Sequence, residues 1–174
     1  MEMIAYHGTN KEILPKIEKQ GLREGESIGD LGKGIYGFLG SKEAAIAFAK
    51  KFSEKNGLVK IEISFEEDEY LDFDDPYFEK MFIDSKEIFL DSAVKALMRN
   101  KNKNKRLCVD GLIIKSMLDT YPDFKNIKLV SKTTFTPSHK EYIGRVPLIS
   151  NFRNGKEVCL YRRNLIKSLE VEEI

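Results

Sequence analysis

Residues 58–65 of this 174-residue chain read LVKIEISF, and apolar and polar side chains alternate along the stretch. A two-residue period places successive side chains on opposite faces of a strand, so the stretch predicts a half-buried β-strand. Its apolar face is expected to consist of Val59, Ile61, Ile63 and Phe65. Helices are predicted before this strand and further strands after it. This order indicates an α+β domain rather than a doubly wound α/β domain.

Two helices and two short strands are predicted before residue 58. In chain order they cover residues 3–6 (strand), 11–20 (helix), 35–36 (strand) and 42–54 (helix). His7 ends the first strand, Thr9 or Asn10 can cap the first helix, and Ser41 can cap the second. A glycine-rich loop connects the first helix to the second short strand.

The part of the chain after residue 65 is predicted to be mainly strands. These cover residues 70–73, 107–115, 127–130, 146–149, 157–161 and 165–171, with a helical region at 77–98 that breaks near Asp84 or Ser85. The strand at 107–115 is expected to be interrupted at Asp110-Gly111, and Glu157 to open its strand. We interpret residues 1–174 as a single domain with an insertion at about 116–153 that carries target recognition or an extra hairpin.

Composition narrows the class of protein. Charged residues make up 33% and hydrophobic residues 41% of the chain, which is typical of a globular domain. The net charge of +1 gives no global electrostatic argument for nucleic-acid binding. The basic tract at 99–106 is interpreted as a solvated loop rather than a phosphate contact, and His139 as a surface histidine.

Sequence patterns for metals and membranes are weak. Cys108 and Cys159 lie within apolar runs, so they are expected to be small buried residues, and no metal site is predicted. The start of the chain does not read as a signal peptide, and no apolar run is long enough to cross a bilayer. We therefore expect a cytoplasmic protein that does not bind membranes.

Three short segments carry residues suited to chemistry: His7-Gly8-Thr9, the sequence GKGIY at 32–36, and the sequence EVCLY at 157–161. The second lacks the spacing of a P-loop, so a phosphate-binding loop is excluded there. Taken singly, each segment has a structural interpretation: a structural histidine, a core tyrosine and a solvated glutamate at a strand end.

In this order the segments resemble the poly(ADP-ribose) polymerase branch of the diphtheria-toxin-like ADP-ribosyltransferases. That family reads H-G-[ST], then G-L-R, G-K-G-I-Y and S-K-x-A, and a glutamate near the start of a late strand. Here the matching segments are at residues 7–9, 21–23, 32–36, 41–44 and 157–161, and the sequence DGLII at 110–114 resembles a strand that precedes the glutamate in related bacterial and phage enzymes. The resemblance covers residues 1–50 and 155–171.

The resemblance implies an ADP-ribosyltransferase fold, with a split antiparallel sheet flanked by N-terminal helices, and NAD as the co-substrate. It implies NAD-binding roles for His7, Gly8, Thr9, Arg23, Tyr36 and Ser41. Gly8 would hold the nicotinamide carboxamide through its backbone, helped by Ser41 or a near neighbour. His7 would bind the adenosine ribose and Tyr36 would stack on nicotinamide, with Arg23 near the adenosine half.

The catalytic set implied by the resemblance is Glu157, His7 and Tyr36. Loss of nicotinamide builds positive charge on the ribose, as in glycosidases, and a fixed carboxylate at position 157 would stabilise that charge. Two departures stand out. The family has a second tyrosine on the following helix, where this chain offers Ile46 or Phe48. Gly155 occupies the position of the Gln or Glu that arginine-modifying toxins carry two residues before the catalytic glutamate.

Several functions remain open at this point. The first is mono-ADP-ribosyl transfer to a protein or nucleic acid, as in a bacterial or phage effector or toxin, with an inhibitory partner if it is a toxin. A related reaction is NAD hydrolysis by an NAD glycohydrolase. A different class is a non-catalytic module that binds NAD or ADP-ribose. RNA 2′-phosphotransfer uses the same fold and NAD but fits the motifs poorly.

Overall fold

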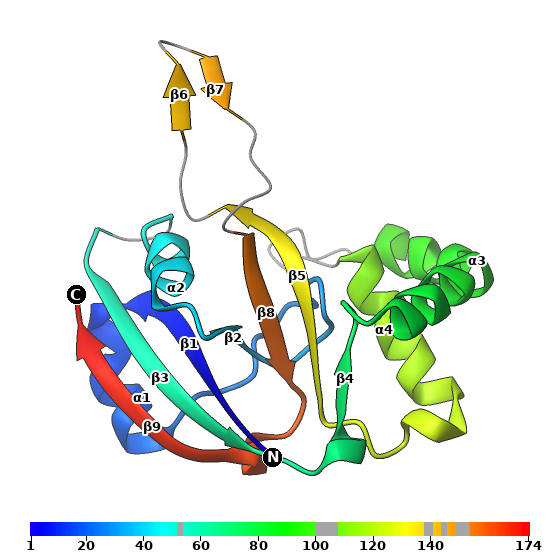
Figure 1. Cartoon of the computed structure of the whole chain (residues 1–174), viewed down its shortest axis with the longest axis horizontal. Coiled ribbons are helices and arrows are strands. Elements are labelled where there is room, and N and C mark those ends of the chain that lie inside the picture. The colour runs from blue at the N-terminus through cyan, green and yellow to red at the C-terminus, as the bar shows by residue number, and fades with distance from the viewer. Residues whose placement is uncertain (52–53, 100–107, 138–140, 144–145, 149–153) are drawn as a thin grey trace.

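The computed structural model describes residues 1–51, 54–99, 108–137, 141–143, 146–148 and 154–174, and its centre is a seven-stranded sheet (Figure 1). In spatial order the strands are β4 (Tyr70–Asp72), β5 (Leu129–Pro137), β8 (Asn154–Leu160), β2 (Ile35–Leu39), β1 (Glu2–Asn10), β3 (Asn56–Ser64) and β9 (Ile166–Glu173). Neighbours are antiparallel except β4 and β5, which are parallel. The chain is α+β, as predicted, but its main sheet is mixed rather than wholly antiparallel, because β4 and β5 are parallel.

A second, two-stranded ladder lies between β5 and β8 in the sequence. It pairs β6 (Glu141–Ile143) with β7 (Val146–Leu148), and in Figure 1 it lies beyond the ends of β5 and β8. The region interpreted as an insertion thus contributes both this ladder and the main-sheet strand β5. Its status as an insertion stays a prediction.

Four α-helices and four short 3₁₀ turns complete the described chain. They are η1 (Lys11–Ile13), α1 (Leu14–Gln20), α2 (Lys42–Ala49), η2 (Glu67–Glu69), α3 (Pro76–Arg99), α4 (Val109–Thr120), η3 (Pro122–Phe124) and η4 (Arg163–Leu165). The side chain of Asn10 accepts from the N–H of Glu12, and that of Ser41 accepts from the N–H of Ala44. The two predicted N-terminal helices are confirmed, although the second ends at Ala49.

The helices pack on both faces of the sheet. Leu14 and Ile17 of α1 join the core that contains Val59 and Ile61. Adjacent strand residues point to opposite faces, and accordingly Leu58 packs with α2 in a separate core. A third core joins α3 and α4 to β4, β5 and β8, on the face that α2 also occupies. The middle of that face, at β2 and β8, lies between α2 and the α3–α4 pair (Figure 1).

The predicted strand at 107–115 is wrong, because residues 109–115 belong to α4. The buried positions of this segment are Gly111, Ile113, Ile114 and Met117, a helical spacing. A Cβ on residue 111 would lie 2.0 Å from the carbonyl oxygen of Gly29, so glycine lets the helix touch the 25–34 loop. Gly111 therefore marks a close contact rather than a strand break, and the match of 110–114 to a family strand does not hold.

Two further expectations are wrong. The break in the helix near Asp84 or Ser85 is absent, since α3 is continuous and the hydroxyl of Ser85 lies 3.1 Å from that of Tyr121. Glu157 lies within β8 rather than at its start, because the strand already begins at Asn154. Residues 100–106 of the basic tract at 99–106 lie outside the described residues, and so does His139.

Gly8 fixes the distance between β1 and α2. A Cβ on residue 8 would lie 1.9 Å from the carbonyl oxygen of Ala45 and 3.1 Å from the Cβ of Ala49. No side chain fits between a strand and a helix that approach this closely. Gly8 is thus required by packing, independently of any ligand.

We expect Gly8→Ala to lower the free energy of unfolding by about 1–3 kcal/mol, because the added methyl group overpacks the contact between β1 and α2. Chemical denaturation monitored by circular dichroism measures this loss. Gly25→Ala is the matched control, since its Cβ would have no neighbour closer than 4.0 Å. Equal stability of the two variants would contradict this account of Gly8.

Candidate functional site

A cavity of about 520 Å³ opens on the sheet face between α2 and the α3–α4 pair. His7 from β1, Tyr36 from β2 and Glu157 from β8 all line it. The 25–34 loop forms another wall through Gly25, Ser27, Gly29, Asp30 and Gly34. The structure therefore brings together the three residues that the sequence motifs singled out.

His7 lies where the pairing between β1 and β2 ends. The last pair of this ladder is Tyr6 with Phe38, and the Nδ1 of His7 then lies 2.8 Å from the carbonyl oxygen of Tyr36. A carbonyl oxygen only accepts hydrogen bonds, so Nδ1 carries the proton and donates. Burial lowers the pKa of His7, although the bond to Tyr36 opposes this effect. The ring is therefore neutral at pH 7, and its Nε2 is an acceptor.

The backbone of Gly8 faces the same opening. The carbonyl of Ile4 accepts from the N–H of Gly40, which places the polar groups of Ile4 on the β2 side of β1. These groups alternate along a strand, so those of Gly8 point to the same side. The register of the ladder would put Gly8 opposite Tyr36, whose carbonyl is bonded to His7 instead. Gly8 thus directs one N–H donor and one C=O acceptor toward the cavity.

Tyr36 forms a wall of the cavity with a fixed ring. Its hydroxyl donates to the carbonyl of Gly32 at 2.8 Å and accepts from the N–H of Leu31 at 2.9 Å. Burial, and to a smaller extent the neighbouring thiol of Cys159, raise the pKa of Tyr36, so the phenol stays neutral. The hydroxyl is engaged in structure, and what Tyr36 offers a ligand is the face of its ring.

The 25–34 loop is held by hydrogen bonds from several parts of the chain. The hydroxyl of Tyr161 donates to the carbonyl of Leu31 at 2.5 Å. The thiol of Cys108, just before α4, donates to a carboxylate oxygen of Asp30 at 2.8 Å. Despite its glycines, this loop is bonded to β2, to Tyr161 just after β8 and to Cys108 just before α4.

Glu157 is a buried carboxylate, with 7% of its surface exposed. It pairs with Phe38 on β2 and Lys132 on β5, near the middle of the sheet. The hydroxyl of Thr134 donates to its Oε1 at 2.9 Å. Thr134 carries no sequence signal of its own, because only the pairing of β5 with β8 brings it to the glutamate.

Phe48 supplies an aromatic residue on the α2 side of the cavity. Its ring centroid lies 5.8 Å from that of Phe38, and the Nζ of Lys51 lies 5.4 Å from its centre. Both residues considered for the second tyrosine position pack against the core that contains Leu58, and of the two Phe48 also lines the cavity.

Three predicted binding residues do not line this cavity. Thr9 pairs with Gly57 on β3, and Ser41 caps α2. Arg23 lies in a separate hollow and donates to the side chain of Gln20 at 2.6 Å. Their roles in NAD binding stay predictions.

The part of the chain that the structure describes offers neither a cluster of metal-binding side chains nor a membrane-spanning helix. No group of three or more His, Cys, Asp or Glu side chains suited to a metal ion occurs there. Within the same residues, no helix is both long and apolar enough to cross a membrane.

We expect the imidazole of His7 to titrate below the ordinary value near pH 6.5, because burial disfavours the cation. Proton NMR measures this, since the chain has only two histidines and His139→Gln assigns the signals. As the pH falls below about 6.5, His7 is protonated in the unfolded chain before it is protonated in the folded chain. This preferential protonation of the unfolded chain lowers the free energy of unfolding. Titration at or above 6.5 would contradict the neutral, Nδ1-protonated ring.

Comparison with known proteins does not assign the chain to a family. No family model matches the chain, and no curated protein does. A solved structure described as the crystal structure of an anti-CRISPR protein is similar over 100% of this chain and 96% of its own, with 14% sequence identity and a TM-score of 0.35. Similarity at that level carries no argument about fold or activity.

Proposed function

We propose that this chain is an NAD-dependent ADP-ribosyltransferase with the corresponding fold, which cleaves nicotinamide from NAD and transfers ADP-ribose to a macromolecular acceptor. One observation carries the proposal: His7, Tyr36 and Glu157, from three separate motifs, line one cavity. The three motifs lie far apart in the sequence, so their convergence supports a shared role.

The nicotinamide half of NAD suits the part of the cavity near Gly8. A carboxamide has one donor and one acceptor group, which complement the C=O and N–H that Gly8 directs there. The ring of Tyr36 offers a flat apolar surface for stacking, and Phe48 offers a second one. Phe48 would thereby take the part of the tyrosine that the family places on this helix.

Glu157 is suited to stabilise the transition state. As the bond between the ribose C1′ and nicotinamide breaks, its electron pair leaves with the ring, and positive charge builds on the ribose. A carboxylate held by the hydroxyl of Thr134 in a largely buried site stabilises that charge without reorganising. An acceptor oxygen or nitrogen then bonds to C1′ and loses its proton, for which the same carboxylate is a suitable base.

His7 is suited to hold the ribose in place by a hydrogen bond rather than to transfer a proton. With Nδ1 bonded to Tyr36, the unprotonated Nε2 can accept a hydrogen bond from a ribose hydroxyl. Its lowered pKa keeps that acceptor available at neutral pH.

Glu157→Gln tests the proposed reaction. We expect nicotinamide release from NAD to fall by roughly 100-fold or more, because the charge opposite the ribose is lost. The Kd for NAD, measured by calorimetry, should stay within a few-fold, since the amide keeps the shape of the side chain. Glu18→Gln on the exposed surface of α1 is the control. Undiminished release by Glu157→Gln would contradict the mechanism.

The same assay separates the alternatives. Transfer places label from NAD on a protein or nucleic acid in a cell lysate. Nicotinamide release without labelled acceptor indicates an NAD glycohydrolase. Binding of NAD without any release by the unaltered chain indicates a non-catalytic module.

Phe48→Ala is expected to raise the KM for NAD by roughly three- to tenfold, because an aromatic contact contributes about 0.5–1.5 kcal/mol beyond the area it buries. Phe48→Tyr should keep the KM close to that of the unaltered chain, since the ring is retained. Initial rates of nicotinamide release over a range of NAD concentrations measure both. An unchanged KM in Phe48→Ala would remove Phe48 from the nicotinamide site.

A further inference from the structure

A second hollow, of about 330 Å³, adjoins the cavity just described. Asp30 lines both hollows. Thr134 lines the second hollow and donates its hydroxyl proton to Glu157, which lines the first. The two hollows therefore meet beside the buried carboxylate, where an acceptor must approach the ribose.

The floor of the second hollow is apolar. Leu31, Phe73 and Ile114 line it, and each is at most 2% exposed. Phe82 lies beside them, with its ring centroid 5.9 Å from that of Phe73 and the two planes at 71°. Such a floor suits the aliphatic or planar part of a long side chain.

The rim of this hollow is acidic. It carries Asp30, Glu79 and Asp110 against one lysine, Lys132. The Nζ of Lys132 lies 3.4 Å from both the carboxylate of Glu79 and the carbonyl of Phe73. The side chains of Lys132 and Glu79 are 36% and 53% exposed, so this pair holds them only weakly. Glu79 thus remains accessible to an incoming cation.

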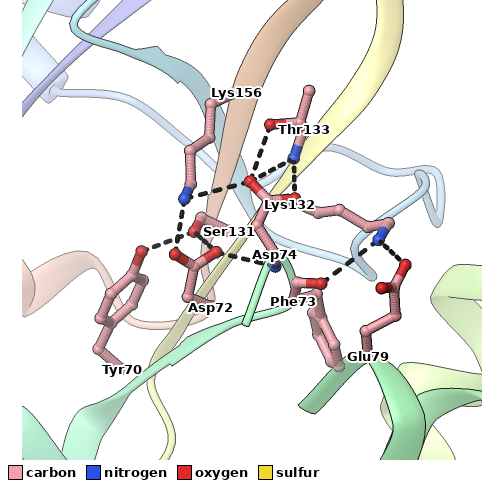
Figure 2. Close-up of polar contacts among 9 residues, drawn as sticks. All are labelled: Tyr70, Asp72, Phe73, Asp74, Glu79, Ser131, Lys132, Thr133 and Lys156. Carbon is pink, nitrogen blue, oxygen red and sulfur yellow. Dashed lines mark hydrogen bonds and ion pairs between the residues drawn. The ribbon is translucent and has the colours of Figure 1, made fainter. Parts of the chain in front are cut away.

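A separate network of acidic and basic side chains lies on the opposite face of β4, β5 and β8, because Tyr70, Asp72 and Ser131 alternate with residues that pack toward the hollow. Figure 2 shows Lys156 between Asp72 and Asp74, with Nζ to oxygen distances of 2.6 and 3.2 Å. In the described residues around the hollow itself, the acids are Asp30, Glu79 and Asp110, and the lysines are Lys132 and Lys86, which pairs with Asp110. The rim therefore carries one more acid than lysine, in a chain with a net charge of +1.

Lys86 already shows how a basic group is received at this edge. Its Nζ lies 2.9 Å from the carboxylate of Asp110 and 5.7 Å from the centre of the Phe82 ring. An ion pair combined with a cation–π contact is the arrangement that a lysine or arginine from outside would find. The side chain of Lys86 is 43% exposed, so an exchange of partners would bury little additional charge.

We propose that the second hollow receives a basic side chain, lysine or arginine, of a polypeptide acceptor. This rests on the proposed ADP-ribosyl transfer and specifies its substrate class. The apolar floor takes the methylene groups, and the rim carboxylates pair with the cation. A nucleic acid is disfavoured at this rim, because its phosphates would meet Asp30, Glu79 and Asp110.

Binding of matched peptides tests this proposal. Fluorescent peptides of one length carry a central Arg, Lys, Ala or Glu, and anisotropy measures their Kd. We expect the Arg and Lys peptides to bind at least tenfold more tightly than the Ala and Glu peptides. The double variant Glu79→Gln/Asp110→Asn should reduce that preference at least tenfold. Glu87→Gln/Asp91→Asn, with the same charge change on exposed positions of α3, should leave it within twofold.

Two outcomes overturn the proposal. One is equal affinity for all four peptides, which the unaltered chain reveals even if the double variant fails to fold. The other is an oligonucleotide that takes up label from NAD while the basic peptides neither bind nor become labelled. Nicotinamide release by the unaltered chain without peptide tests the proposed function separately, so release combined with no peptide preference removes only the present inference.

Discussion

The hydrogen bond from the imidazole of His7 to the carbonyl of Tyr36 is the interaction on which the site depends. A buried carbonyl needs a partner, and in a continuous ladder the N–H of Gly8 would supply it. Because the imidazole takes that place, β1 and β2 part after Tyr6 and Phe38 while the polar group stays satisfied. One side chain thereby opens the sheet, turns the backbone of Gly8 to the cavity and fixes its own tautomer.

Distant parts of the chain must come together before this opening has walls. The position of Glu157 in the cavity depends on the pairing of β8 with β2 and β5. The pairing with β5 also brings the hydroxyl of Thr134 to its carboxylate. Phe48 depends on α2 packing against the bare backbone of Gly8. The acidic hollow depends on α3, α4 and β5 together. The chemistry proposed here is thus a property of the whole fold rather than of any one motif.

Local signals in the sequence predicted local structure well. The alternation of residues 58–65 and the caps at Asn10 and Ser41 act within a few residues, and the structure confirms the elements that they predict. The prediction of a strand at 107–115 was wrong. Gly111 was interpreted as a break in that strand, whereas a glycine is needed there because the backbone contacts Gly29, far away in the sequence. Thr134 gave no signal for the same reason, since only strand pairing brings it to Glu157. The convergence of the three motif residues came from resemblance, and no periodicity would have indicated it.

The glycine-rich loop at 25–34 has a consequence for selectivity. Folding already fixes it through the hydroxyls of Tyr36 and Tyr161 and the thiol of Cys108. A molecule that enters the cavity therefore loses no affinity to ordering this wall, and the loss of chain entropy falls on folding instead. Because this wall is rigid, we expect it to select ligands by shape and to exclude bulkier compounds that a flexible loop would accommodate.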